Sequence, residues 1–266
     1  MKFIAYCRSC YSLNTKSNCA ILAPFLVYRM FDIVPESTTN LYSLPNQVNY
    51  FPCKTLICDD CGFVGVNILF DDEEMNKLYL NYRDSNYNAT RVHFEPNYGI
   101  TRFQKRDDYV VGVEHFIGKN ISNIKSLIDY GGSNGLNTPH IGDSRYIYDI
   151  SQVNLEDETL VYTPVLFKCD LITCMQVLEH VPDPNIILQE IANNSNYCYF
   201  EVPNEHGGKK EFWHEHINSF NITSFTNLIS KYFTILDSRE IVVIAGGLER
   251  NVLQILCLNS KPEIAV

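Results

Sequence analysis

The sequence predicts an α/β protein in which a mostly parallel sheet with an antiparallel last strand follows a small cysteine-rich module. Residues 119–258 alternate apolar runs with helical segments, an order that places helices over both faces of a parallel sheet. The last two apolar runs flank Ala245-Gly246-Gly247-Leu248, which favours an antiparallel hairpin at the edge of the sheet. Six of the ten cysteines lie before residue 70 and mark the N-terminal module.

The elements of the α/β region follow from these runs. We expect strands at residues 126–130, 145–149, 169–174, 197–202, 233–244 and 251–258, and helices at 182–194 and 222–231. The links 136–145 and 151–168 are short for full helices, since a parallel crossover needs about a dozen residues. Asp71-Asp72-Glu73-Glu74 predicts a helix N-terminus, where the helix dipole favours carboxylates.

Composition restricts the class of protein and its partners. Hydrophobic residues make up 45% and charged residues 20% of the 266 positions, as in soluble globular proteins. The net charge of −10 argues against nucleic acid as the main partner, because phosphate binding needs a basic surface. No uncharged apolar stretch reaches about 18 residues, so no membrane span is expected. The start, Met1-Lys2-Phe3-Ile4, does not resemble a secretory signal, and we expect a cytoplasmic protein.

Two C-x2-C pairs in the N-terminal module predict a structural zinc site. Each pair presents two thiolates from one turn, and four thiolates fill a tetrahedral zinc site without an open position. The gap between the pairs exceeds the usual span of roughly 15–20 residues, so unligated buried thiols are the alternative. The predicted ligands are Cys7, Cys10, Cys58 and Cys61, with Cys19 and Cys53 as spare candidates.

A glycine-rich turn directly after the first expected strand predicts a cofactor site. The residues concerned are Asp129, Gly131, Gly132, Ser133 and Gly135. Glycine at such a turn lets the backbone approach a ligand closely and adopt positive φ. The nicotinamide fingerprint G-x-G-x-x-G is absent, and so is the Gly-Lys-Ser/Thr ending of a P-loop.

What remains, an acid followed by x-G-x-x-x-G, resembles the class I S-adenosylmethionine-dependent methyltransferases. The resemblance covers four segments over about 75 residues. It implies a Rossmann-like core, with Asp149 at the end of the second strand as the ribose-binding acid. It also places Met175 and Gln176, within Cys169–Val181, beside the methionine end of S-adenosylmethionine, and identifies Tyr197–Asn204 as the fifth strand. Ser133 departs from the glycine usual in the family.

The densest group of titratable residues is Glu211-Phe212-Trp213-His214-Glu215-His216. It follows the fifth expected strand and Gly207-Gly208, so it is a candidate for the acceptor side of the cleft. The two histidines are two residues apart, which does not match the H-E-x-x-H metal motif. Histidine suits a general base near neutral pH, and a structural role for the histidines is the alternative.

Together with the cysteine module, this segment resembles the zinc-containing methyltransferases that modify sugars. Their Y-H-E-H segment implies that His216 is the base, with Glu215 and His214 beside it and Trp213 in place of the tyrosine. Tyr82 and Tyr87, in the loop Tyr79–Tyr87, resemble the substrate loop of those enzymes. The resemblance divides the chain into a zinc-binding module at 1–70, a helical substrate-side linker at 71–118 and a methyltransferase domain at 119–266.

The function implied is methyl transfer to a sugar, a nucleotide-linked sugar or a phosphoryl precursor of bacterial surface polysaccharide. The partner would then be a small carbohydrate-type acceptor. Two alternatives stay open at this point. A non-catalytic, zinc-stabilised binding protein would explain Ser133 and the short adenine side of the pocket, whereas a nicotinamide-dependent nucleotide-sugar enzyme lacks its fingerprint.

Overall fold

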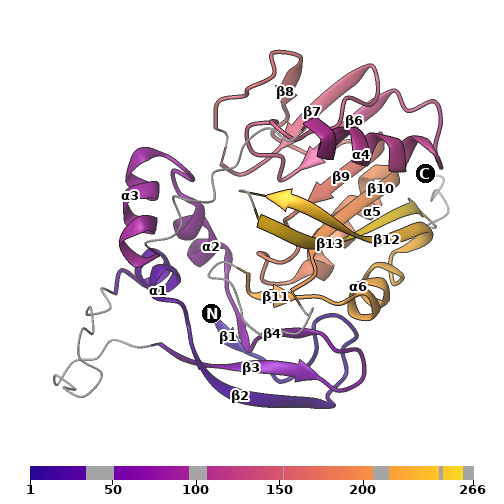
Figure 1. The fold of residues 1–266 in the computed structure, drawn as a ribbon. Helices are drawn as coiled ribbons and strands as arrows, with labels where there is room; N and C mark the ends of the chain where they lie inside the picture. The colour runs from indigo at the N-terminus through magenta and orange to yellow at the C-terminus, as the bar shows by residue number, and fades with distance from the viewer. Residues whose placement is uncertain (34–50, 96–106, 152, 206–215, 246–247, 260–266) are drawn as a thin grey trace.

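The core of the protein is a seven-stranded sheet in the order β12-β13-β10-β9-β6-β7-β8 (Figure 1). A computed structural model describes residues 1–33, 51–95, 107–151, 153–205, 216–245 and 248–259. The strands are β6 (Ser126–Tyr130), β7 (Ser144–Tyr148), β8 (Leu160–Tyr162), β9 (Cys169–Met175), β10 (Ser195–Pro203), β12 (Phe233–Ala245) and β13 (Leu248–Asn259).

Strand directions match the expected fold. β8, β7, β6, β9 and β10 run parallel, whereas β13 runs antiparallel to β10 and pairs with β12 in a hairpin. The strand order reverses at β6, which lies between β7 and β9. In such sheets, ligands bind beyond the carboxyl ends of the strands at this reversal. The glycine-rich turn lies there, because it directly follows β6.

The two links that the sequence marks as short contain no helix in the residues described. Residues 131–143 form turns between β6 and β7, and the segment between β7 and β8 is equally irregular. β8 itself, at 3 residues, is too short to show a strand period in the sequence and was not among the expected strands. It forms because it pairs in parallel with β7, Arg145 opposite Leu160.

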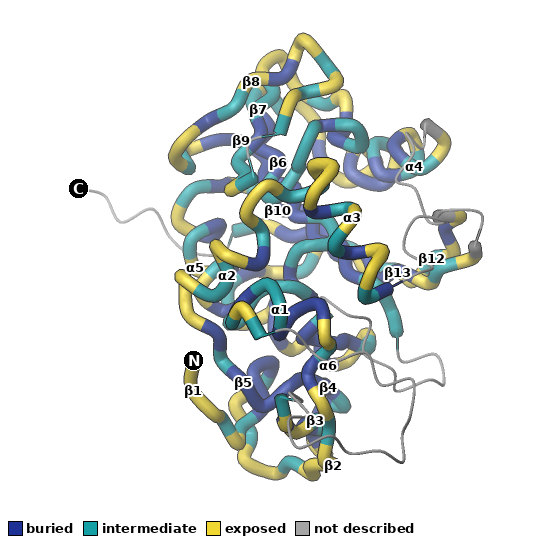
Figure 2. The backbone as a smooth tube through the Cα atoms, turned by 90° about the vertical axis from the view of Figure 1, so that its left-hand side faces the viewer, coloured by how far each residue is buried: buried dark blue, intermediate teal, exposed yellow. Residues whose placement is uncertain are grey.

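Three helices accompany this sheet: α4 (Asp107–Gly118), α5 (Pro184–Asn194) and α6 (Ile222–Ile229). α5 begins where the Asp183 side chain accepts from the Asn185 amide, with proline in the first turn. α6 begins with a capping box between Asn221 and Ser224. Buried residues follow the strands and the inner faces of these helices (Figure 2). No helix in the described part of the chain is long and apolar enough to cross a membrane.

The N-terminal region has its own sheets and helices, seen at the lower left of Figure 1. Its elements are β1 (Lys2–Phe3), β2 (Thr15–Ile21), α1 (Pro24–Phe31), β3 (Pro52–Cys58), β4 (Val64–Val66), β5 (Ile68–Leu69), α2 (Asp72–Tyr79) and α3 (Ser85–Phe94). The expected helix after Asp71 is α2, which starts with a capping box between Asp71 and Glu74. A strand from far along the chain, β11 (Asn218–Ser219), completes the order β11-β4-β3-β2.

Arg8 links three strands of the smaller sheets, β4, β5 and β11. Its side chain is buried and donates to Asn218 Oδ1 (2.6 Å), to the Val66 carbonyl (2.8 Å) and to the Ile68 carbonyl. Burial lowers the pKa of Arg8 to about 10, so the guanidinium stays charged at neutral pH. One cation therefore satisfies three acceptors on β4, β5 and β11 at once.

We expect Arg8→Ala to lower the free energy of unfolding by at least about 3 kcal/mol, because it leaves buried acceptors without donors. Urea unfolding measures this change. The matched control is Lys16→Ala, which removes an exposed cation that pairs with Asp59 at 2.9 Å and should cost less than about 1 kcal/mol. Equal effects of the two substitutions would contradict the role given to Arg8.

Candidate functional site

The turn after β6 requires glycine at two positions. Gly131 has φ +73°, and its amide donates to the Tyr148 carbonyl at 2.8 Å. A Cβ on Gly131 would lie 2.5 Å from Val177 Cγ2, and one on Gly135 (φ +76°) would lie 2.2 Å from Leu160 Cδ1. Both positions combine positive φ with a close neighbour, so a side chain would force the turn to move.

Ser133 occupies the left-handed region as well, with φ +52°. Its amide donates to Asp149 Oδ2 at 2.8 Å, and its carbonyl accepts from the Tyr162 hydroxyl at 2.8 Å. These contacts from β7's end and from β8 hold a non-glycine residue in a conformation that L residues rarely adopt. The departure from glycine is thus accommodated by contacts with Asp149 and Tyr162, which lie outside the turn.

Asp129, in β6, is buried beneath the turn. Its carboxylate accepts from the Thr138 hydroxyl (2.6 Å) and from the Thr173 hydroxyl (2.8 Å). Burial raises the pKa of Asp129 to about 6, although the two hydroxyls act in the opposite direction. A Cβ on Gly132 would lie 2.7 Å from Asp129 Oδ2. Asp129 therefore stabilises the segment after β6 through its hydrogen bonds with Thr138 and Thr173.

Asp149 directly follows β7, as the ribose-binding assignment requires. Besides the Ser133 amide, it accepts from the amide and hydroxyl of Ser151 at 2.7 and 2.5 Å. The side chain is partly exposed. Each carboxylate oxygen has two lone pairs, so Oδ2 retains capacity for a further donor. The carboxylate is thus oriented by the turn and open to a ligand hydroxyl.

Glu201 organises the carboxyl end of β9, and it was not identified from the sequence. It is buried in β10 and accepts from Gln176 Nε2 (2.8 Å) and from the Tyr109 hydroxyl of α4. Tyr199 and Gln254 donate to its second oxygen at 3.1 and 2.7 Å. Gln176 adopts φ +58°. Glu201 therefore fixes Gln176 and Tyr109 beside the carboxyl end of β9.

A second group of titratable side chains lies where β9 and β10 end. Glu179 and His180 follow β9, Glu205 follows β10, and His216 approaches from just before β11. The His216 Nδ1 lies 2.5 Å from Glu205 Oε1, and the His180 and His216 ring centroids are 4.7 Å apart. The two rings are nearly perpendicular, at 80°.

Glu179 is the unusual member of this group. Only 1% of it is exposed, and neither carboxylate oxygen has a hydrogen-bond partner among the described residues. Burial raises the pKa of Glu179 to about 8, with His216 acting in the opposite direction. Glu179, His180 and Glu205 were not singled out as site residues from the sequence. Their proximity could have been predicted, because the carboxyl ends of parallel neighbouring strands meet at one edge of a sheet.

Residues 103–232 match the family model described as a methyltransferase domain. The chain contains a methyltransferase domain. The glycine-rich turn, the acid after β7 and the antiparallel last strand are all features of this fold, and the protein is an S-adenosylmethionine-dependent methyltransferase. No curated protein matches the chain in sequence.

Solved structures similar to this methyltransferase include two of the same broad kind. The N-methyltransferase NodS from Bradyrhizobium japonicum WM9, in complex with S-adenosyl-l-homocysteine, is 9% identical with a TM-score of 0.46, over 62% of this chain and 92% of that one. An S-adenosylmethionine-dependent methyltransferase from Clostridium acetobutylicum ATCC 824 is 9% identical with a TM-score of 0.46, over 66% and 100% of the two chains. At this level of similarity, the assignment rests on the family match and on the chain's own geometry.

The structure describes only some of the predicted substrate and catalytic residues, and it places them in different surroundings. Trp213, His214 and Glu215 lie outside the described residues. Tyr87 is 1% exposed and packs edge-on against Phe25, so its ring belongs to the N-terminal core. Tyr82 is partly exposed. Tyr79 joins the two regions, with ring centroids 5.4 Å from Tyr82 and 6.5 Å from His180.

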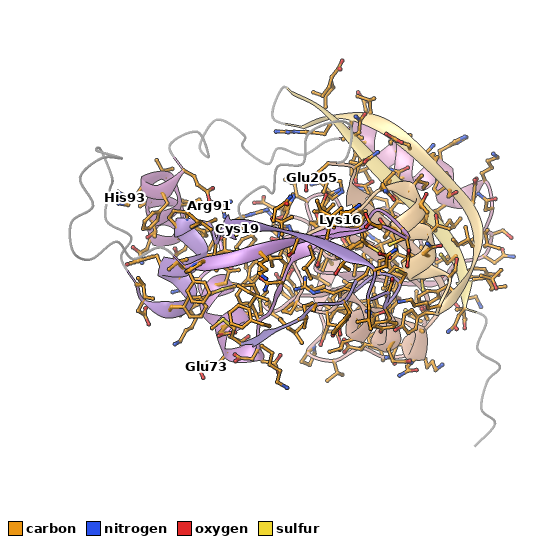
Figure 3. The ribbon with its side chains drawn as sticks, turned by 90° about the horizontal axis from the view of Figure 1, so that it is seen from below. Lys16, Cys19, Glu73, Arg91, His93 and Glu205 are labelled. Atoms are coloured by element: carbon orange, nitrogen blue, oxygen red, sulfur yellow. The ribbon has the colours of Figure 1, made fainter. Side chains whose placement is uncertain are left out.

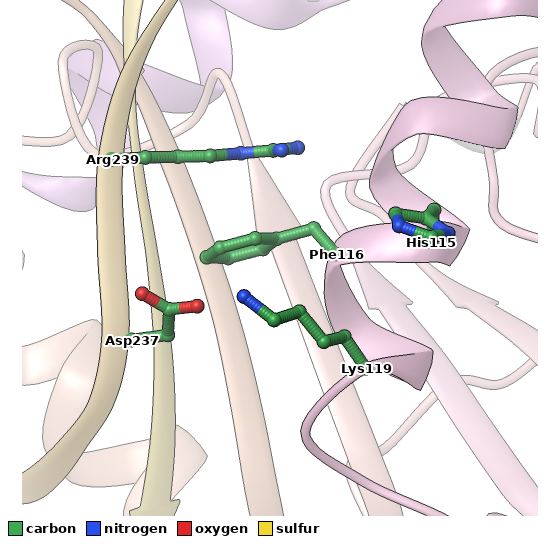
Figure 4. A pocket seen from close by; sticks show the side chains of 5 residues that line it. All are labelled: His115, Phe116, Lys119, Asp237 and Arg239. Carbon is green, nitrogen blue, oxygen red and sulfur yellow. The ribbon is translucent and has the colours of Figure 1, made fainter.

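A hollow of about 300 Å³ lies away from the glycine-rich turn (Figure 4). It is lined by His115, Phe116, Lys119, Asp237 and Arg239. The Arg239 guanidinium stacks 4.2 Å above the Phe116 ring centroid. This end of α4 leads into the start of β6, so the hollow lies at the amino edge of the sheet, opposite the glycine-rich turn.

Asp129 should make the stability of the methyltransferase depend on pH. Its folded pKa of about 6 exceeds the ordinary 3.8, so the folded state holds the proton while the unfolded state releases it. Stability therefore falls as pH rises from about 4 to 6, by up to about 3 kcal/mol for two pH units. Asp129→Asn should remove this slope, as measured by urea unfolding without added cofactor.

The control for this experiment is Asp170→Asn. The amides of Lys125 and Ser126 donate to Asp170 at 2.9 and 3.0 Å and lower its pKa. Its contribution has the opposite sign, because stabilisation by an ionised carboxylate is lost as pH falls. An unchanged slope in Asp129→Asn would show that another group titrates.

Proposed function

We propose that this enzyme methylates a sugar, a nucleotide-linked sugar or a phosphoryl precursor of bacterial surface polysaccharide. The observation that carries the proposal is the pairing of His216 with Glu205, which follows the carboxyl end of β10. S-adenosylmethionine supplies an electrophilic methyl group when bound. A hydroxyl acceptor must lose a proton as it attacks, and the His216 group is where we place that assistance.

The residues proposed for the cofactor divide the work. Asp149 accepts from the ribose hydroxyls. The glycines of the turn Gly131–Gly135 let its backbone approach the cofactor closely. Met175 and Gln176, held by Glu201 and Tyr109, line the methionine end. Asp129 supports the turn from beneath. Positioning of donor and acceptor in one enclosed site supplies a large part of the rate in such transfers.

Support for a carbohydrate acceptor comes from the combination of features in one chain. Four cysteines, a methyltransferase domain and a His-Glu-His segment together resemble the zinc-containing sugar methyltransferases. Tyr79 places an aromatic ring between Tyr82 and His180, and aromatic rings suit the apolar faces of sugars. We propose Tyr82 and Trp213 as acceptor contacts, together with the catalytic segment His214–His216.

The test of the acceptor class is methyl transfer from labelled S-adenosylmethionine to a panel of nucleotide-linked sugars and phosphosugars. A product heavier by one methyl group is expected from at least one of them. A matched panel of catechols and small amines is the control. Turnover confined to that second panel would replace the carbohydrate proposal with another acceptor class, while leaving the enzyme class intact.

The cofactor assignment predicts that Asp149→Ala weakens S-adenosylhomocysteine binding about 10- to 100-fold in calorimetric titration. The reason is the loss of charged hydrogen bonds to the ribose, each worth about 1.5–3 kcal/mol. Asp143→Ala is the matched control, because Asp143 is exposed just ahead of the same strand. Undiminished affinity in Asp149→Ala would reject the ribose contact.

We also propose that Cys7, Cys10, Cys58 and Cys61 bind a structural zinc ion. Their sulfur atoms all lie within 4.8 Å of one another. The Cys7–Cys61 and Cys10–Cys58 sulfur distances are both 3.6 Å. Tetrahedral zinc with bonds of about 2.3 Å places its sulfur ligands about 3.8 Å apart. The donor set therefore fits zinc, and the full set of four thiolates suits a structural ion.

Cys58→Ser should lower the zinc content by one ion per chain and the melting temperature by on the order of 10 °C, as expected for losing several kcal/mol in a chain of this size. Elemental analysis and thermal unfolding measure the two effects. Cys19→Ser is the control, since Cys19 is an exposed free thiol in β2. Full zinc content in Cys58→Ser would disprove the assignment.

A further inference from the structure

The Glu179 carboxyl group is buried and has no hydrogen-bond donor among the described residues. In contrast to Asp129 and Glu201, it accepts no hydrogen bond from the described residues, although the side chain is 1% exposed. Leaving a buried carboxylate unpaired is costly, so such groups ordinarily bind a cation or a donor. Neither Glu179 nor Glu205 forms an ion pair with lysine or arginine in the described part of the chain.

Two imidazoles face this carboxylate. One ligand atom from each of Glu179, His180 and His216 lies within 4.8 Å of the other two. His180 Nε2 is 3.7 Å from Glu179 Oε1. Nitrogen and carboxylate ligands bind first-row metals at roughly 2.0–2.2 Å, so an ion bound among the three atoms would draw them closer together. Two histidines and one carboxylate form a recognised set for divalent transition metals.

Glu205 supplies the outer support that such a site needs. Its Oε1 lies 2.5 Å from His216 Nδ1, which favours the tautomer carrying the proton on Nδ1 and the lone pair on Nε2. Histidines that bind metals usually donate their second nitrogen to a carboxylate or carbonyl in this way. Glu205 is labelled in Figure 3, where the N-terminal region meets the later strands.

The backbone around the three residues is fixed. The Asn218 amide donates to the Glu179 carbonyl at 3.0 Å, and its side chain donates to the carbonyls of Leu178 and Val181 at 2.9 and 2.7 Å. Asn218 is only two residues after His216, so the loop carrying Glu179 and His180 is held in register with His216. Preorganised ligands of this kind bind ions without a large ordering cost.

We propose that Glu179, His180 and His216 bind a divalent transition-metal cation, with Glu205 orienting His216. Three protein ligands leave coordination positions open for acceptor oxygens. An acceptor hydroxyl bound to the cation would lose its proton to water more readily. His216 would then assist as a ligand and not as the base. As the acceptor oxygen bonds the methyl carbon, the carbon–sulfur bond of S-adenosylmethionine would break and S-adenosylhomocysteine would leave. This catalytic part rests on the proposed function, whereas binding of the cation does not. The acceptor class it favours carries neighbouring oxygens, as in a sugar diol.

The experiment is titration of the zinc-loaded, full-length protein with MnCl2, followed by the electron paramagnetic resonance signal of free Mn²⁺. Manganese prefers nitrogen and oxygen ligands, so the cysteine site keeps its zinc. We expect one Mn²⁺ per chain. Glu179→Gln should abolish this binding, and Glu205→Gln should weaken it about 10- to 100-fold. His93→Ala is the control, because His93 is exposed on α3, at the edge of the molecule in Figure 3.

Binding of S-adenosylhomocysteine, measured on the same samples, separates the possible failures. Protein that binds S-adenosylhomocysteine but no Mn²⁺ would overturn the cation site and leave the proposed function standing. Mn²⁺ binding that survives both Glu179→Gln and His216→Ala would also overturn it. Mn²⁺ binding lost in Glu179→Gln, in a protein without affinity for S-adenosylhomocysteine, would support the cation site while the proposed function fails.

Discussion

The hydrogen bonds of Asn218 hold the parts of this protein in one arrangement. Its side-chain oxygen accepts from Arg8, which in turn binds the carbonyls of β4 and β5. Its side-chain amide and backbone bind the loop after β9, and β11 pairs it with Gly65. Arg8 lies between Cys7 and Cys10 of the cysteine cluster. The cysteine site and the His216 group are therefore connected through two fully buried side chains.

The glycine-rich turn is stabilised in a different way, because short irregular links follow β6 and β7 in the described residues. Without helices after β6 and β7 in the described residues, side chains of the turns themselves must hold the backbone. Asp149 binds the Ser133 amide, and Tyr162 binds both the Ser133 and Val153 carbonyls. A serine with positive φ is thereby retained where glycine would be relaxed. The glycine-rich turn is therefore held by side-chain contacts from the segments that follow it in the chain.

Long periodic segments were predictable from the sequence, and contacts between distant segments were not. β6, β9, β10, β12 and β13 have apolar patterns set by burial, and the zinc-type cysteine spacing is local. β8 has too few residues to show a period. The grouping of Glu179, His180 and Glu205 could not be predicted from local sequence. It arises because β9 and β10 end at the same edge of the sheet and because β11 pairs with the N-terminal sheet. Tyr87 belongs to a loop that resembles the substrate loop of the sugar methyltransferases, yet its ring packs in the core beside Phe25.

Three buried carboxylates near the carboxyl edge of the sheet show how partners decide a residue's role. Glu201 accepts four donors and Asp129 accepts two, so each is satisfied within the fold and serves to position its neighbours. Glu179 is as deeply buried and accepts none from the described residues. Burial penalises the charged form of each group, and Glu179 has no donor among the described residues to offset that penalty. A buried carboxyl group without a donor among the described residues, beside two imidazoles, is best explained by a cation that binds there.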